Sequence, residues 1–148
     1  MSSLSLASLR CATTRVASRA ARVLVAGMLF GCALEPVDRS HEGRLEEGDR
    51  RHDADGSFFD EYRFDAEKGW RIRVEMTSSE LDPFLQLRRV GASDADFLRQ
   101  NDDAEEGSTT ARISLRAPAR GTYVIWANSF QSGQTGAYAV RVEAKPER

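Results

Sequence analysis

The feature that most constrains this chain is the run Trp70-Arg71-Ile72-Arg73-Val74-Glu75-Met76, in which even positions are apolar and odd positions are charged. Side chains alternate between two faces only along an extended strand, so the run predicts a strand with one buried and one solvated face. Half-buried strands of this kind are typical of antiparallel sheets. The fold must therefore contain a sheet that packs on a core with one face and exposes its other face to solvent.

Similar short strand signals recur along the chain, and no helix of useful length interrupts them. Turn-forming sequences such as Ser132-Gly133 separate the segments. Seven or eight short strands predict an all-β fold, namely a two-sheet antiparallel β-sandwich that is jelly-roll-like. Besides 70–76, the predicted strands are Phe58–Phe64, Phe84–Val90, Phe97–Gln100, Ala111–Leu115, Thr122–Ser129, Ala137–Val142 and a short one at Gly43–Leu45.

The first 31 residues carry four arginines and no acidic residue, and they end in the apolar run 23–31. A membrane-spanning helix needs about 20 apolar residues, whereas the core of an export signal needs about 7–15, so this run predicts a signal peptide. The tetrad Leu29-Phe30-Gly31-Cys32 resembles a bacterial lipobox. The resemblance implies a lipoprotein-type signal over 1–31, an acylated Cys32 inserted in the bilayer, and a polar tether over 32–41.

Two other interpretations of the leader stay open. Cleavage after Ala33 releases a soluble periplasmic or secreted protein, and an arginine- and serine-rich leader also suits an organelle transit peptide. We expect an exported, membrane-anchored lipoprotein of the outer membrane. Cys11 lies in the leader and Cys32 is the lipid site, so no cysteine remains for a disulfide in the folded part.

Charge argues against nucleic acid as a partner. Four of the 21 basic residues lie in the first 31 residues, so the remainder holds 17 basic and 23 acidic residues, a net charge of −6. Neutralising phosphates requires a basic face, which this balance does not favour.

An ordered set of motifs resembles the bacterial pre-peptidase C-terminal domain family. The motifs are Gly43-Arg-Leu45-Glu-Glu-Gly48-Asp49, Asp60-Glu-Tyr62-Arg-Phe64, Asp82-Pro83-Phe84-Leu85-Gln-Leu87, Asn101-Asp102-Asp103, Ala119-Arg-Gly121-Thr122-Tyr123 and Gly136-Ala-Tyr138-Ala-Val140-Arg-Val142. The resemblance implies a jelly-roll-like sandwich over 42–148 that aids secretion, anchoring or substrate attachment without doing chemistry. Family members usually follow a secreted hydrolase. No peptidase precedes the domain in this sequence, so we expect it to act as an independent module.

Catalysis finds little support in the residue types. The two histidines, His41 and His52, do not occur at a metal-ligand spacing, and no Gly-x-Ser-x-Gly elbow is present. We therefore expect a non-catalytic module of the cell envelope that binds an envelope polymer or a secreted protein. The alternative is an accessory protein that aids secretion or stability of a separately encoded hydrolase.

The acidic run 100–108, "QNDDAEEGS", is a candidate calcium loop. If successive strands alternate in direction, the loops 77–83, 101–110 and 130–136 meet at one end of the sandwich. Asp60 shares a face with core residues and needs a partner, because an unpaired buried carboxylate is costly. Two interpretations stay open: a calcium ion held by Asp60, Asn101, Asp102 and Asp103, or a turn that Asp60 braces by accepting its N–H groups.

Two aromatic residues are candidates for ligand contact. Trp126 and Phe59 lie opposite the core-facing positions of their strands, and exposed aromatic rings stack well on sugars or proteins. The competing interpretation assigns Trp126 to a covered, core-like position.

Overall fold

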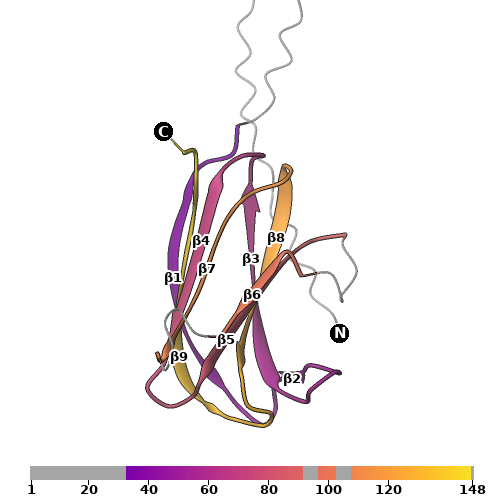
Figure 1. The fold of residues 1–148 in the computed structure, drawn as a ribbon, viewed down its shortest axis with the longest axis vertical. Coiled ribbons are helices and arrows are strands. Elements are labelled where there is room, and N and C mark those ends of the chain that lie inside the picture. Colours follow the sequence, from indigo (N-terminus) through magenta and orange to yellow (C-terminus); the bar gives the residue numbers. More distant parts are fainter. Residues whose placement is uncertain (1–32, 92–96, 103–107, 148) are drawn as a thin grey trace, which may run out of the picture. The chain divides into compact units, whose positions relative to one another are not determined.

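The computed structural model describes residues 33–91, 97–102 and 108–147, and residues from 32 onward form one compact unit. Within these ranges no helix is long and apolar enough to cross a membrane. The described residues form nine antiparallel strands in two sheets packed face to face (Figure 1). The strands are β1 (Val37–Leu45), β2 (Arg50–Arg51), β3 (Phe58–Ala66), β4 (Arg71–Thr77), β5 (Pro83–Arg89), β6 (Arg99–Asn101), β7 (Thr110–Arg116), β8 (Gly121–Ser129) and β9 (Gly136–Lys145).

The strand order is that of a jelly roll. One sheet has the order β1-β9-β4-β7 and the other β2-β3-β8-β5-β6. Counted without the two-residue β2, the orders become 1-8-3-6 and 2-7-4-5, so the chain changes sheets between most consecutive strands. This is the double Greek-key arrangement of jelly-roll proteins, and the all-β sandwich expected from the sequence is confirmed.

The alternation in the sequence builds the core between the sheets. Ile72, Val74 and Met76 on β4 are fully buried, while the alternating positions Arg71 and Arg73 point to solvent. Their inward neighbours on β9 are Val140, Val142 and Ala144, which pair with them in register. The facing sheet contributes residues such as Leu85, Leu87, Tyr123 and Ile125 to the same cluster. Burial of these side chains at about 25 cal/mol per Å² is the main stabilising contribution.

Strand β1 is longer than the sequence suggested, and this corrects the predicted tether. We expected a short strand at Gly43–Leu45 and a polar tether up to residue 41, but β1 begins at Val37 and pairs with β9 over its whole length. The interior of β1 is charged, because it is an edge strand with little surface to bury, and the apolar pattern therefore missed it. Cys32 lies outside the described residues.

The turns at the lower end of the sandwich in Figure 1 lie together, as strand alternation predicted. The N–H of Ser78 donates to the carbonyl of Thr109 (3.2 Å), and the N–H of Phe130 donates to the carbonyl of Asp82 (2.9 Å). These bonds join the β4–β5, β6–β7 and β8–β9 connections. This end of the sandwich holds the candidate site.

Candidate functional site

The outer face of the four-stranded sheet becomes hollow toward its lower end. Its upper part is covered mostly by long charged side chains, with Arg71, Arg73, Glu75, Arg112, Arg116, Arg141, Glu143 and Lys145 pointing outward. The next outward positions on the central strand β9 are Ala139 and Ala137, and Thr77 is the neighbour of Ala139 on β4. The change from long to short side chains leaves a trough that follows β9.

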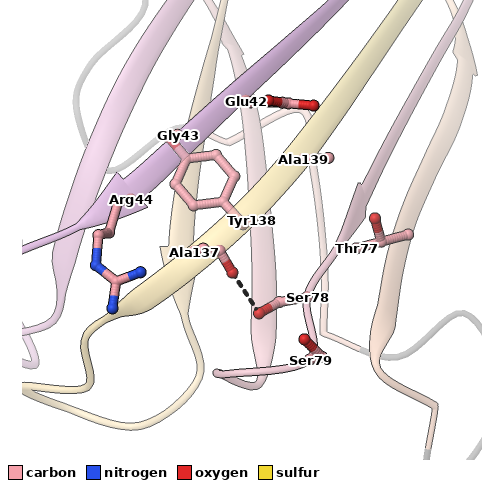
Figure 2. Close-up of a pocket in the computed structure, with 9 residues that line it drawn as sticks. All are labelled: Glu42, Gly43, Arg44, Thr77, Ser78, Ser79, Ala137, Tyr138 and Ala139. Atoms are coloured by element: carbon pink, nitrogen blue, oxygen red, sulfur yellow. Dashed lines mark hydrogen bonds between the residues drawn. The ribbon is translucent and has the colours of Figure 1, made fainter.

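This trough is an open groove of about 690 Å³ (Figure 2). Its floor is formed by Ala137 and Ala139. One wall comes from β1 and carries Glu42 and Arg44, and the other comes from the end of β4 and carries hydroxyl groups. The full lining is Glu42, Gly43, Arg44, Thr77, Ser78, Ser79, Ala137, Tyr138 and Ala139. A wide, open groove with an apolar floor and polar walls suits an extended partner better than a small buried ligand.

Ser78 fixes the hydroxyl-bearing wall. Its side chain is 8% exposed, and its Oγ donates to the carbonyl of Ala137 (2.7 Å), the bond drawn in Figure 2. The same Oγ accepts from the N–H groups of Glu80 and Leu81, both at 3.0 Å. A serine after a strand therefore closes the β4–β5 turn and ties it to β9. Leu81, in the same turn, is 4% exposed and packs in the core, so the turn that forms this wall of the groove is fixed to the body of the domain.

Gly136 allows this turn to lie against β9. A Cβ placed on Gly136 would come within 2.8 Å of the Cβ of Glu80, which is closer than real contacts allow. The Glu80 carboxylate accepts from the N–H of Ala137 (3.0 Å) and pairs with Arg44 (3.1 Å). Arg44 and Glu80 are about half exposed, so their ion pair bridges the end of the groove without closing it.

A second hollow continues the groove around the β4–β5 turn. It has a volume of about 400 Å³ and shares Ser79 with the groove. The other residues of its lining are Glu80, Leu81, Asp82, Ser108, Thr109 and Gln134. The side chain of Gln134 accepts from the N–H of Asp82 (3.2 Å), so an amide, two carboxylates and several hydroxyls meet there. We call the groove and this hollow together the polar strip.

An exposed aromatic residue lies at the same end of the sandwich as the polar strip, but its ring is on the outer face of the five-stranded sheet. Phe130 is 58% exposed, the highest value among the exposed large apolar side chains of the described residues. Its ring contacts the ring of Phe84 edge-on, with centroids 6.2 Å apart. Sequence reasoning missed Phe130. A usable signal was its place between a strand and the turn residues Ser132-Gly133, where an aromatic side chain has no core to enter.

The predicted calcium ligands are not brought together. Asp60 pairs with Ala127, Ala127 with Leu85, and Leu85 with Asn101, so Asp60 and Asn101 lie on one row but three strands apart. At about 4.8 Å per strand, that row spans about 14 Å, too far for one ion to bind both side chains. Asn101 instead accepts from the N–H of Arg112 (2.9 Å). Asp102 lies at the end of β6, and Asp103 lies outside the described residues.

Asp60 has another partner. Its carboxylate accepts from the hydroxyl of Tyr138, and the hydroxyls of Tyr138 and Tyr62 lie 2.7 Å apart. Burial raises the pKa of Asp60, the bond from Tyr138 opposes this effect, and nearby Asp49 adds to it. Gly43 makes the contact possible, because a Cβ there would overlap the Tyr138 ring at 2.4 Å. Asp60 therefore joins the two sheets and does not brace the acidic loop.

Phe59 and Trp126 lie on the outer face of the five-stranded sheet but are covered. They are 3% and 5% exposed and stack on each other with centroids 4.4 Å apart. Phe97 and His52 pack on the edge of the Trp126 ring, and a pocket of about 390 Å³ beside them has arginines at its rim. A ligand there reaches little of either ring, so the structure favours the core-like interpretation of Trp126.

The side chains of the polar strip can form hydrogen bonds and van der Waals contacts with a partner. The Ser78 hydroxyl is committed to three backbone groups. No histidine lines either hollow. In the described part of the chain, no group of three or more histidine, cysteine, aspartate or glutamate side chains is arranged to hold a metal ion. The strip offers hydrogen-bond donors and acceptors, and the ring of Phe130 is exposed at the same end of the sandwich.

Comparisons with known proteins reveal the fold of this chain. No protein-family model and no curated sequence matches it. PliG of Aeromonas hydrophila, a periplasmic inhibitor of g-type lysozyme, is similar with a TM-score of 0.56 and 17% identity, over 74% of this chain and 88% of that one. The pre-peptidase C-terminal domain of a Bacillus anthracis collagenase is similar with a TM-score of 0.55 and 15% identity, over 72% and 89%. These similarities confirm the sandwich fold that the sequence motifs implied.

Proposed function

We propose that this protein is a non-catalytic binding module of the bacterial envelope, and that the polar strip recognises an envelope polysaccharide. The observation that carries the proposal is the run of hydroxyl, amide and carboxylate groups along the groove and the second hollow, with the exposed ring of Phe130 at the same end of the sandwich. Sugars need this combination, because their hydroxyls form hydrogen bonds while their C–H faces pack on aromatic rings. The open shape of the groove suits a chain of sugar units.

Export and lipid attachment are part of the same proposal. The basic leader, the apolar run 23–31 and Cys32 support a lipoprotein signal, and the solved structures with a similar fold include a periplasmic protein. Mass spectrometry of the membrane fraction tests this point. We expect the mature chain to begin with a lipid-modified Cys32, and an unmodified chain that begins at Leu34 contradicts the anchor.

A protein partner is the second candidate, since PliG uses a similar fold to inhibit a g-type lysozyme. The pre-peptidase C-terminal resemblance adds a third partner class, a separately encoded secreted hydrolase that the module assists. Both are treated as outcomes of the binding experiment, because the likeness to these structures shows the fold alone.

Co-sedimentation tests the proposal with residues 33–148, which contain the compact unit and its own core. Purified peptidoglycan sacculi and lipopolysaccharide vesicles serve as polysaccharide probes, and a g-type lysozyme serves as the protein probe. Ala139→Trp fills the groove, and Ser114→Trp is its control, since Ser114 is exposed on the same face of the same sheet. Phe130→Ala removes the ring, and Val90→Ala is its control because Val90 is 49% exposed elsewhere.

We expect the wild-type chain to sediment with one polysaccharide probe. Loss of one stacking ring should weaken binding about 3- to 10-fold, and the groove-filling variant should weaken it at least as much. The two control variants should bind as the wild type does. Binding to lysozyme alone, or equal losses in the controls and the site variants, contradicts the polysaccharide proposal.

A further inference from the structure

We propose that strand β1 is an assembly edge, at which a second copy of this chain pairs antiparallel and joins two four-stranded sheets into one of eight strands. The proposal does not rest on the proposed function, although Glu42 and Arg44 of β1 also line the groove. It rests on the state of the sheet edges and on the order of charges along β1.

The four sheet edges differ in how well they are closed. Strands β2 and β6 have only two and three residues, which gives another strand little to pair with. The edge of β7 is partly closed, because Asn101 accepts from the backbone N–H of Arg112. Strand β1 has nine residues in unbroken register with β9, and no other strand of the described residues pairs with its free side. It is therefore the long open edge.

The charges of β1 are complementary to themselves in one antiparallel register. When His41 lies opposite His41 of the second copy, Asp38 lies opposite Arg44, and the two-fold axis repeats this pair. In the same register Ser40 lies opposite Glu42, and Val37 lies opposite Leu45. Opposite charges on facing positions stabilise strand pairs, and like charges destabilise them.

Neighbouring registers lack this match. Sliding by two residues one way sets Asp38 against Glu42, and sliding the other way sets Glu42 against Glu42 of the second copy. Sliding by one residue places inward side chains opposite outward ones, which sheet geometry forbids. One register is thus favoured over its alternatives.

Arg39 decides whether the edge is usable. It is an exposed charged residue at an inward-facing position of an edge strand, a device that normally blocks pairing. In the favoured register Arg39 lies opposite Gly43, whose inner side is filled by the ring of Tyr138. The exposed side chain of Arg39 instead lines a hollow of about 340 Å³ beside Arg63 and Asp65, where the guanidinium has room. Asp38 and Arg44 are available too, since their pairs with Arg141 (3.2 Å) and Glu80 (3.1 Å) are more than half exposed on the β1 side.

Sedimentation velocity on residues 33–148, over about 1–500 µM to cover weak association, measures the dimer. We expect a concentration-dependent monomer–dimer equilibrium for the wild type. Asp38→Arg or Arg44→Asp alone should raise the dissociation constant about tenfold, because each reverses two facing charge pairs. The double variant Asp38→Arg/Arg44→Asp should return it to within about threefold of the wild type.

Arg141→Ala is the matched control. This variant removes Arg141, the residue of β9 that pairs with Asp38 within one chain, but it leaves all residues of β1 unchanged. The dimer should therefore persist. A wild type that stays monomeric throughout overturns the proposal. A dimer that ignores both single reversals, or that the double variant does not restore, also overturns it, because the subunits then meet through another surface or register.

Discussion

The two outer faces of the sandwich differ in what covers them. On the five-stranded sheet, Phe59 and Trp126 form a second small core, and the guanidinium groups of Arg50 and Arg88 lie over their rings at 4.8 and 4.3 Å. On the four-stranded sheet, the same outward positions carry exposed ion pairs such as Arg112–Glu75 (2.7 Å). The alternation of side chains along the strands assigns both faces to the outside of the sandwich. It does not indicate which of them is covered by other parts of the chain.

The comparison teaches that the two faces contribute to different properties. The aromatic face removes apolar surface from water and thereby stabilises the fold. The ionic face keeps its charges hydrated, so it adds solubility and contributes little to stability. The proposed binding groove lies at the lower end of the ionic face, where long charged side chains give way to alanine and threonine.

Among the substitutions on the two faces, the removal of the Trp126 side chain should change stability the most. Trp126→Ala takes the centre out of the aromatic face and should lower the free energy of unfolding by about 3–5 kcal/mol, as large-to-small core substitutions do. Urea denaturation followed by circular dichroism measures the change. The matched change on the ionic face, Glu75→Ala, should cost less than about 1 kcal/mol. Equal losses contradict the assignment of the aromatic face as a core.

Glu61 binds the arginine side chains that lie on the aromatic face, and its substitution tests how much these contacts stabilise the protein. Its carboxylate accepts from Trp126 Nε1 (3.2 Å), Arg63 Nε (2.7 Å) and Arg50 Nη1 (3.3 Å). Burial alone raises the pKa of Glu61, but the bonds from Arg63 and Trp126 outweigh it and leave the pKa lowered. Glu61→Gln should therefore cost about 1–3 kcal/mol at pH 7.

The pH dependence of this variant checks the sign. A carboxyl with a lowered pKa in the folded state stabilises the protein above its unfolded pKa, and the contribution is lost as pH falls through the folded value. Denaturant titrations at pH 7 and at about pH 3, below the ordinary glutamate pKa, should show the gap between wild type and Glu61→Gln shrinking. A gap that does not change with pH contradicts the ionised role of Glu61.

Asp60, between the two sheets, should show the opposite pH dependence. Its pKa is raised by burial, so the folded state holds the proton more tightly, and stability falls as pH rises through the folded pKa. Asn at this position still accepts from Tyr138. Asp60→Asn should therefore match or exceed the wild type at pH 7, by about 1 kcal/mol at most, and the advantage should disappear at low pH in thermal melts.

The same variant bears on calcium. Asp60 is three strands from Asn101, so any rise in melting temperature on adding calcium should be unchanged in Asp60→Asn. A calcium response that this variant abolishes shows that the separation does not persist in solution.

The smallest effect should come from the ionic face. Arg112→Ala removes the pair with Glu75, in which both side chains are more than a third exposed, and should change stability by no more than about 0.5 kcal/mol. Adding salt to about 1 M shortens the screening length to about 3 Å and should erase even that difference. A larger, salt-resistant loss shows that the ionic face contributes to the fold after all.

Much of the fold could be predicted from the sequence, because strands with one buried face show an alternation of apolar and polar residues. The segment 70–76 predicted β4, and similar patterns predicted seven other strands. The extent of β1 was missed, since a charged edge strand has no apolar period. The groove was missed too. Ala137 and Ala139 form its floor only because the outward side chains around them in the sheet are longer, and the sequence does not show which residues are neighbours in the sheet. The partner of Asp60 comes from a strand 78 residues away, a relation that no local pattern encodes.

The direction of β1 determines how an anchored molecule stands on its membrane. For a chain held at Cys32, only residues 33–36 separate the lipid from the first strand, a span of at most about 14 Å. Strand β1 then runs for about 20 Å from Val37 to Gly43, at the wall of the groove. A single copy anchored in this way would keep its domain close to the bilayer and its groove at the end remote from the lipid, whereas antiparallel pairing of two β1 edges would place the partner's Val37 at that remote end. An anchored copy on so short a tether would therefore reach only material that lies close to the membrane.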